Sequence, residues 1–221
     1  MIKTTILVDN PNSWVVPYVR KIKRIAPKKY DISIVHDSQD VAEGEILFLI
    51  GCMKMISREV LGLNKHNLVI HESDLPRGRG WSPVSWQILE GKNEIPIVLF
   101  EADEKLDAGP IYLKDWIKFD GTELLDEIKI KQGEKTVELA VRFLEAYPEI
   151  RATAQADIQP TVYRKRNTFD DRLDIEKSIA DNFNHLRIVH NEKYPAWFEY
   201  KGKKYVLKIY KKDERETEYR N

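Results

Sequence analysis

The sequence predicts an α/β fold: a mostly parallel, twisted sheet with helices on its faces, followed by a small extension of one helix and one hairpin. Two observations predict it. Over residues 3–101, short apolar segments of strand type alternate with segments whose apolar residues recur at helical spacing. Such alternation is typical of parallel sheets, in which helices connect successive strands. Near the end of the chain, a helical pattern precedes two strands separated by Lys201 and Gly202, a pair typical of a tight turn.

Five strands are expected in the first part of the chain, because each is a short apolar or alternating run bounded by turn-forming residues. They are residues 3–8, 30–36, 45–50, 67–71 and 95–101. From Ser13 onward, apolar residues at helical spacing predict a helix between the first two strands. A shorter helix is expected over residues 56–63, with Ser57 as its N-cap.

Two further helical patterns follow, over residues 121–147 and 175–190. Gly133 is expected to break the first of them into two pieces, because glycine lowers helix stability. The sequence between the two patterns is polar and irregular. This change of character predicts one domain over residues 1–155 and a small C-terminal subdomain over residues 156–221.

Composition narrows the class of function. The 221 residues contain 36 Lys and Arg against 36 Asp and Glu, so the chain lacks the basic excess of a nonspecific nucleic-acid binder. The single cysteine, Cys52, cannot form an internal disulfide, which suits a reducing compartment. No apolar run is long enough to span a bilayer, and the N-terminus lacks a signal pattern. We expect a cytoplasmic protein with no nucleic-acid or membrane partner and no metal.

The densest group of chemically capable residues is the segment IHESDLPRGRGWSPVSWQ, residues 70–87. In it, His71 ends an apolar strand and is followed by a loop rich in glycine, proline and arginine. Asp107 follows the strand over residues 95–101. If these neighbouring strand ends meet at one edge of the sheet, Asp107 can orient His71 and raise its proton affinity. Alone this is weak evidence, because a histidine at a strand end is more often structural.

Three motifs resemble those of the folate-dependent formyltransferases. Residues 71–83, HESDLPRGRGWSP, resemble the signature in which His-x-Ser-x-Leu-Pro leads into Gly-x-x-Pro. Residues 106–109, Leu-Asp-Ala-Gly, resemble the family's Leu-Asp-Thr-Gly, whose aspartate is catalytic. Residues 55–61, MISREVL, are similar to the Ile-Leu-Pro-x-x-Val-Leu segment that binds the pterin through its backbone. The order and approximate spacing of the three motifs match the family over residues 1–120.

The resemblance implies a Rossmann-like formyltransferase fold with its catalytic domain over residues 1–155, and 10-formyltetrahydrofolate as the cofactor. His71 and Asp107 are the implied catalytic residues. His71 would stabilise the oxyanion or relay the amine proton, and Asp107 would hold His71 and favour its charged form. The residues expected to bind the cofactor are Met55, Ile56, Leu99, Glu101 and Asp103. The residues expected to bind the substrate are Ser73, Arg77, Arg79 and Trp81, since arginines suit a diphosphate and Trp81 a base or sugar.

The chain departs from the family at one position. The family carries Asn-x-His, in which the asparagine amide helps to hold the formyl oxygen, whereas Val69 precedes His71 here. Asn67 lies another two residues back, about 6.5 Å along an extended strand, and is a poor substitute. Either another donor replaces the amide, or the activity is weakened or lost.

The acceptor differs between members of the family. The enzymes that act on methionyl-tRNA carry a larger, basic C-terminal domain than this neutral chain offers. Four C-terminal motifs resemble those of bacterial sugar N-formyltransferases; they are residues 163–166, 171–174, 184–187 and 194–198. The likeness extends to the short enzyme of pseudaminic-acid-type pathways. It implies a UDP-linked 4-amino-4,6-dideoxy sugar as the small-molecule substrate, although each tail residue could equally be structural.

Other interpretations stay open at this point. The acceptor could instead be glycinamide ribonucleotide or an aminoacyl group. The substitution at Val69 also leaves room for a non-catalytic folate- or nucleotide-binding module, and for a hydrolase that releases formate from formyl-folate. The sequence does not decide between a monomer and a homodimer.

Overall fold

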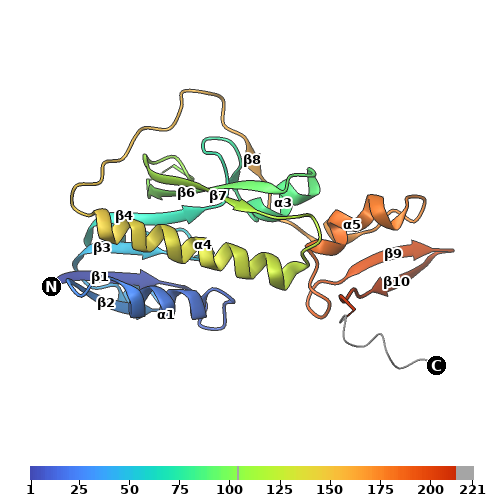
Figure 1. The fold of residues 1–221 in the computed structure, drawn as a ribbon, viewed down its shortest axis with the longest axis horizontal. Coiled ribbons are helices and arrows are strands. Elements are labelled where there is room, and N and C mark those ends of the chain that lie inside the picture. Colours follow the sequence, from blue (N-terminus) through green and yellow to red (C-terminus); the bar gives the residue numbers. More distant parts are fainter. Residues whose placement is uncertain (104, 213–221) are drawn as a thin grey trace.

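The computed structural model describes residues 1–103 and 105–212, and Figure 1 shows their arrangement. The main sheet has six strands in the order β2-β1-β3-β4-β6-β7. They are β1 (Ile2–Leu7), β2 (Tyr30–Val35), β3 (Gly44–Leu49), β4 (Asn64–His71), β6 (Glu94–Glu101) and β7 (Ile111–Lys118). The first four pair in parallel, whereas β6 pairs antiparallel with both β4 and β7. Within this sheet β6 alone is reversed, so the predicted mostly parallel sheet is confirmed.

The reversal of β6 corrects the expected position of its carboxyl end. In the register of the two strands, Glu101 lies opposite Leu68 and Val98 lies opposite His71. The carboxyl ends of β4 and β6 therefore do not meet at one edge, as the sequence pattern suggested. The segment after β6 instead folds back beside β4 before it enters β7, and this return path brings Asp107 toward His71.

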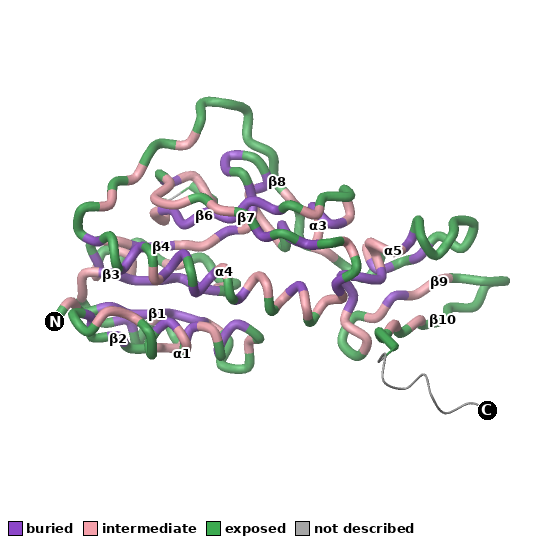
Figure 2. Tube along the Cα trace, in the orientation of Figure 1, coloured by how far each residue is buried: buried purple, intermediate pink, exposed green. Residues whose placement is uncertain are grey.

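Helices cover the two faces of the sheet unequally. The large core packs beneath α1 (Val16–Ile25), α3 (Pro83–Leu89) and α4 (Leu125–Ala146). A smaller cluster around Leu7, Leu47 and Leu49 lies on the other face, against the one-turn helix α2 (Arg58–Leu61). Ser57 caps α2, as predicted: its side chain accepts a hydrogen bond from Val60 N. Figure 2 shows the buried segments concentrated in the strands and along α4.

Helix α4 is continuous, and the predicted break at Gly133 is wrong. Gly133 is buried where α4 crosses α1, and a Cβ atom built on it would lie 2.5 Å from the ring of Tyr18. The glycine therefore permits close packing of two helices and does not end either of them.

We expect Gly133→Ala to lower the free energy of unfolding by about 1 kcal/mol, because overpacking outweighs the better helix propensity of alanine. Urea denaturation measures the change. The loss should shrink in a Tyr18→Ala background, where the added methyl group meets no ring. An equal loss in both backgrounds would contradict the packing explanation.

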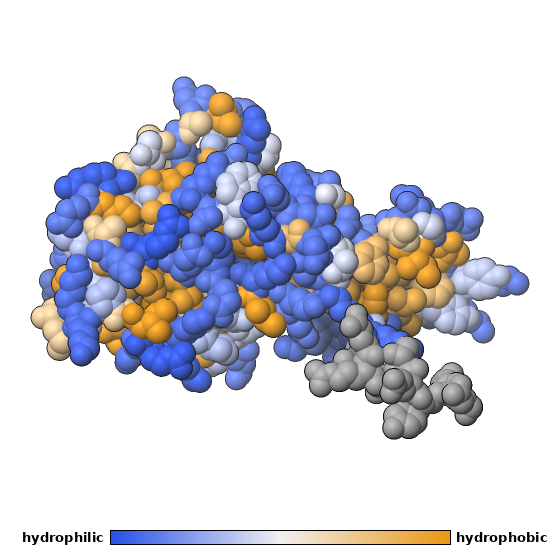
Figure 3. Space-filling view, viewed as in Figure 1, coloured by the Kyte–Doolittle hydropathy of each residue, from blue (hydrophilic) through white to orange (hydrophobic). Residues whose placement is uncertain are grey.

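The C-terminal part forms a small unit beside the start of α4 (Figure 1). It contains the short helical segment η2 (Thr168–Asp171), α5 (Ile179–Arg187), and the antiparallel pair β9 (Ala196–Tyr200) and β10 (Lys203–Leu207). Lys201 and Gly202 both have positive φ, so the predicted hairpin turn is confirmed. A separate cluster around Leu173, Leu186 and Ala196 forms the core of this unit. Figure 3 shows apolar side chains gathered on its surface over α5 and β9.

A pair of two-residue strands connects the segment after α4 to the main body. Strand β5 (Arg79–Gly80), in the loop after His71, pairs in parallel with β8 (Val162–Tyr163). The β5–β8 pair thus joins the segment after α4 to the loop that carries the signature motif.

One further short helical segment, η1 (Ser38–Asp40), follows β2.

Candidate active site

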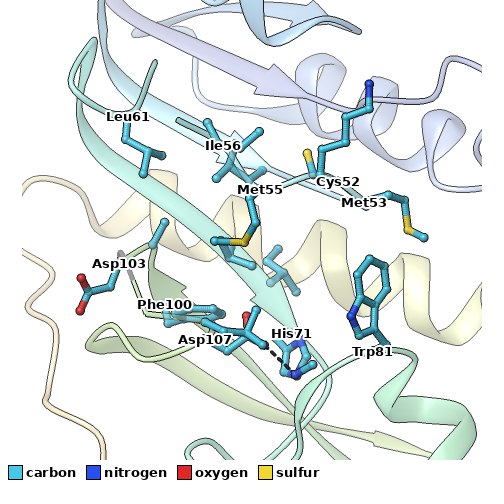
Figure 4. Close-up of a pocket in the computed structure, with 18 residues that line it drawn as sticks. Cys52, Met53, Met55, Ile56, Leu61, His71, Trp81, Phe100, Asp103 and Asp107 are labelled. Atoms are coloured by element: carbon cyan, nitrogen blue, oxygen red, sulfur yellow. Dashed lines mark hydrogen bonds and ion pairs between the residues drawn. The ribbon is translucent and has the colours of Figure 1, made fainter. Parts of the chain in front are cut away.

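His71 and Asp107 face a cavity of about 260 Å³ on the side of the sheet that carries α2. Figure 4 shows Leu61, Ile56 and Asp103 at one end of it and Met53 and Trp81 at the other. His71 and Asp107 lie between these ends, where β4 and the segment after β6 line the cavity (Figure 4). A cavity with a titratable pair between its two ends can hold two reactants in contact.

The loop after β4 fixes both members of the pair. The Nε2 atom of His71 lies 2.8 Å from the carbonyl oxygen of Gly78 and 3.9 Å from Asp107 Oδ2. Asp107 Oδ2 in turn accepts a hydrogen bond of 2.8 Å from the backbone N of Gly80. His71 is 7% exposed, and Asp107 has a φ of 47°, a left-handed conformation unusual for a residue with a side chain. The carboxylate is thus at ion-pair distance from the imidazole and is held there by the glycine loop.

The predicted cofactor residues divide into two groups. Met55, Ile56 and Asp103 line the cavity together with His71 and Asp107. Leu99 does not: its side chain is fully buried in the large core on the opposite face. Glu101 is also outside, where its carboxylate accepts a hydrogen bond of 2.9 Å from the Tyr112 hydroxyl.

The reason is the alternation of side chains along β6. Phe100 and Ala102 face the cavity, so Leu99 and Glu101 must face away from it. The predicted segment therefore lines the cavity, but the side chains of Leu99 and Glu101 do not.

The predicted substrate residues do not share one cavity, because the residues of the signature loop line three different cavities. Trp81 lines the same cavity as His71 and Asp107. Ser73 and Arg77 line a second cavity of about 430 Å³, and Arg79 lines a third of about 580 Å³. The structure therefore does not bring Ser73, Arg77 and Arg79 into the cavity that Trp81 shares with His71 and Asp107.

Val69 lines the cavity two residues before His71, on the same face of β4. The position that was compared with the family's amide therefore lies at the candidate site. The side chain of Asn67 is buried and donates a hydrogen bond of 3.0 Å to the carbonyl oxygen of Leu61. Asn67 holds the end of α2 and does not replace the missing amide.

Several site residues were not identified from the sequence. Phe100 forms part of the apolar wall, and the backbone groups of Gly78 and Gly80 contact His71 and Asp107, respectively. Asp9, in the polar cluster after β1, accepts a hydrogen bond of 3.2 Å from Lys54 N and so shapes the rim of the cavity. Its position in a turn after a buried strand was the available signal.

Comparison with known proteins agrees with this geometry. The family model described as formyl transferase matches residues 11–144. The chain belongs to the formyl transferase family. A methionyl-tRNA formyltransferase of Thermosynechococcus vestitus is 23% identical over 154 residues, which are 69% of this chain and 46% of that protein. The chain therefore spans less than half the length of this curated relative.

Three solved structures show the same fold. A methionyl-tRNA formyltransferase from Clostridium thermocellum has a TM-score of 0.80 at 18% identity and covers 96% of this chain and 94% of its own. A 4-N formyltransferase from Francisella tularensis has a TM-score of 0.75 at 14% identity, covering 96% and 98%. HypX from Aquifex aeolicus, in complex with tetrahydrofolic acid, has a TM-score of 0.73 at 17% identity, covering 94% and 37%.

The formyl transferase family uses formyl-tetrahydrofolate, and the cavity suits such a group. Its walls are apolar at Leu49, Ile56 and Phe100, whereas Asp103 supplies a polar edge. A flat heterocycle binds best in a narrow apolar slot with a few polar groups at its rim. Among the described residues, no cluster of His, Cys, Asp or Glu could hold a metal ion, and no helix is long and apolar enough to cross a membrane.

Glu72, next to His71, is a half-buried carboxyl group that lies beside the candidate site and does not line its cavity. Gln132 donates a hydrogen bond of 2.7 Å to its side chain. Burial raises the pKa of Glu72, against the opposing effect of the nearby His71 ring, and the charge of Asp107 raises it further. Because its folded-state pKa lies above the unfolded value, this group contributes less stability as the pH rises from the unfolded toward the folded pKa.

We expect Glu72→Gln to remove this pH dependence, because glutamine keeps the hydrogen bond from Gln132 without a charge. The variant should gain unfolding free energy relative to the wild type at pH 8 but not at pH 4. Urea denaturation at the two pH values measures the difference. An offset of equal size at both pH values would show that the Glu72 carboxyl group does not change its protonation in this range.

Proposed function

We propose that this chain transfers a formyl group from 10-formyltetrahydrofolate to the primary amine of a nucleotide-linked 4-amino-4,6-dideoxy sugar. The observation that carries the transfer chemistry is the His71–Asp107 pair between the two ends of one cavity. The acceptor rests on the C-terminal motifs and on the fold likeness to a 4-N formyltransferase that matches this chain over nearly its whole length. The longer methionyl-tRNA relatives favour the tRNA acceptor as the second candidate.

The two ends of the cavity suggest which reactant each would hold. The end formed by Ile56, Leu61 and Asp103 would bind the pterin, because it is apolar with a polar edge. The end formed by Met53 and Trp81 would admit the acceptor, with the indole ring available to stack on a sugar or base. When bound, the cofactor supplies an activated formyl group.

The chain's own residues would then control charge and protons. His71 would hold the developing oxyanion or take the amine proton at its ring nitrogen, as general acid–base catalysis requires. Asp107 would keep the imidazole oriented and stabilise its charged form across 3.9 Å. The Gly80 N–H donated to Asp107 would keep that carboxylate in place during the reaction.

The test is formyl transfer by the purified chain from 10-formyltetrahydrofolate to three amines: the UDP-linked 4-amino-4,6-dideoxy sugar, glycinamide ribonucleotide and methionyl-tRNA. Mass spectrometry should show the sugar nucleotide gaining one carbonyl group, at the highest specificity constant of the three. A higher constant for either of the others would reject the sugar. Turnover without any amine would indicate a formyl-folate hydrolase, and no turnover a binding module.

Restoring the family's amide should raise turnover. We expect Val69→Asn to increase kcat by about tenfold, because a well-placed oxyanion donor contributes about a hundred- to a thousandfold and an introduced amide is held less precisely. Val69→Leu is the matched control, since leucine has the shape of asparagine without its polar atoms. Equal rates for the two variants would show that another group already holds the formyl oxygen.

A further inference from the structure

The segment that follows α4 crosses the catalytic loop instead of leaving the domain. It runs from Gln155 to Tyr163 and ends in β8. Only Tyr163 belongs to a motif that resembles the sugar N-formyltransferases. Tyr163 O accepts a hydrogen bond of 3.0 Å from Trp81 N, so the segment is bonded to the loop at its far end. It thus links α4 to the loop that holds both members of the catalytic pair.

Gln155 contacts the catalytic aspartate turn and the catalytic loop with one side chain. Its Nε2 atom donates hydrogen bonds of 2.9 Å each to the carbonyl oxygens of Asp107 and Gly109. Its Oε1 atom accepts a hydrogen bond of 2.9 Å from Arg79 Nη2. Both ends of one amide group are thus directed at the two segments that meet at the site.

The turn at residues 107–109, to which Gln155 is hydrogen-bonded, has an unfavourable backbone conformation. Asp107 has a positive φ, which costs a non-glycine residue about 1–3 kcal/mol and persists only where surrounding contacts enforce it. Gly109 lies so close to β6 that a Cβ atom built on it would be 1.8 Å from the carbonyl oxygen of Glu101. The Gln155 amide is hydrogen-bonded to the carbonyl oxygens of both Asp107 and Gly109, and so connects the two ends of this turn.

Thr161 makes the corresponding contact on the histidine side. Its Oγ1 atom accepts a hydrogen bond of 2.8 Å from Gly78 N, and its carbonyl oxygen accepts one of 2.9 Å from Arg79 N. Gly78 is the residue whose carbonyl oxygen contacts the ring of His71. Thr161 therefore fixes the peptide that orients the imidazole.

We propose that Gln155 and Thr161 are positioning residues for the catalytic pair, Gln155 acting through the Asp107 turn and Thr161 through Gly78. The proposal rests on the proposed transfer chemistry at His71 and Asp107. The segment that carries both residues lies largely at the surface, and neither residue lines the cavity that would hold the reactants. Their loss should therefore lower kcat more than it alters the KM for the formyl donor, because a displacement of about 1 Å at a reactive pair can cost a hundredfold.

The experiment compares Gln155→Met, which keeps the length of the side chain and loses its hydrogen bonds, with Gln159→Met in the same segment. Gln159 is exposed and serves as the matched control. We expect kcat to fall by about ten- to a hundredfold for Gln155→Met, with the KM for the formyl donor within about twofold of wild type. Gln159→Met should match the wild type. Thr161→Val should show the same kind of loss, and Thr161→Ser, which keeps the acceptor oxygen, should restore most of it.

Amide hydrogen exchange at Gly80, followed by NMR, tests the positioning without any assay of turnover. The Gly80 N–H that bonds to Asp107 should exchange faster in Gln155→Met and in Thr161→Val than in wild type or Thr161→Ser. If the wild type transfers formyl to no amine, the proposed function fails and this exchange measurement still decides the positioning. Unchanged exchange at Gly80 in both loss variants would overturn the proposal. If Gln155→Met does not fold, the comparison of Thr161→Val with Thr161→Ser still decides between the two outcomes.

Discussion

His71→Ala is expected to lower the turnover number by about a hundredfold or more, the range in which general acid–base groups contribute. The imidazole lies between the two ends of the cavity, is almost fully buried, and has Asp107 at ion-pair distance. Alanine removes the ring beside this carboxylate and leaves nothing in its place for the proton transfer. Steady-state formyl transfer at saturating amine and 10-formyltetrahydrofolate measures the effect.

The control for this variant is His36→Ala. His36 follows β2 and its Nδ1 atom contacts the carbonyl oxygen of Val8, outside the cavity of the catalytic pair. Its loss should leave turnover near that of wild type. Asp107→Asn should lie between wild type and His71→Ala, because asparagine can keep the bond from Gly80 N but not the charge. Wild-type turnover in folded His71→Ala would show that the chemistry is carried by another group.

The sequence predicted five of the six strands of the main sheet, but neither β7 nor the direction of β6. Apolar runs and their turn-forming boundaries identified five of the strands, because burial on both faces requires such runs. A buried strand has the same apolar pattern whether it is parallel or antiparallel to its neighbours. Nothing in residues 95–101 therefore indicated the reversal of β6. The meeting of His71 with Asp107 was therefore predicted, but by a route that the register of β4 and β6 contradicts.

Long-range packing explains the other differences. From the sequence, Gly133 could be interpreted only by its neighbours in the chain. The structure shows that a glycine is needed there because the ring of Tyr18, on a helix far away in the sequence, packs against it. In the signature loop, Ser73, Arg77 and Arg79 have no regular side-chain period, so the sequence could not show that they point into different cavities. Strand periodicity could have separated Leu99 from Phe100, since successive residues face opposite sides.

Arg187, in one of the C-terminal motifs, has a structural role in the fold. Arg187 belongs to the segment that resembles sugar N-formyltransferases, and a substrate contact was one interpretation of it. It is 1% exposed, and its Nη2 atom lies 3.2 Å from Glu123 Oε2, just before α4 begins. Its Nη1 atom donates hydrogen bonds to the side chains of Asn93, at 2.9 Å, and Asn184, at 3.1 Å. Arg187 thus connects the C-terminal unit to the main body.

Arg187→Ala is accordingly expected to lower the free energy of unfolding by about 3–5 kcal/mol, the usual cost of removing one partner of a buried ion pair. Glu123 would keep Lys131 as a partner but lose the guanidinium beside it in the interior. Arg142→Ala is the matched control. Arg142 lies exposed on α4 and pairs with Asp115 at the surface, where such pairs contribute about 0–1 kcal/mol.

Urea denaturation of the two variants, monitored by tryptophan fluorescence, separates the structural role of Arg187 from a role in binding. A structural Arg187 predicts a large loss of stability, with the KM for the acceptor unchanged under conditions in which the variant is folded. A stable Arg187→Ala variant with a raised acceptor KM would instead make the arginine a substrate ligand. In that case α5 would belong to the acceptor site, since Arg187 is its last residue, and the acceptor would have to reach beyond the cavity of His71 and Asp107.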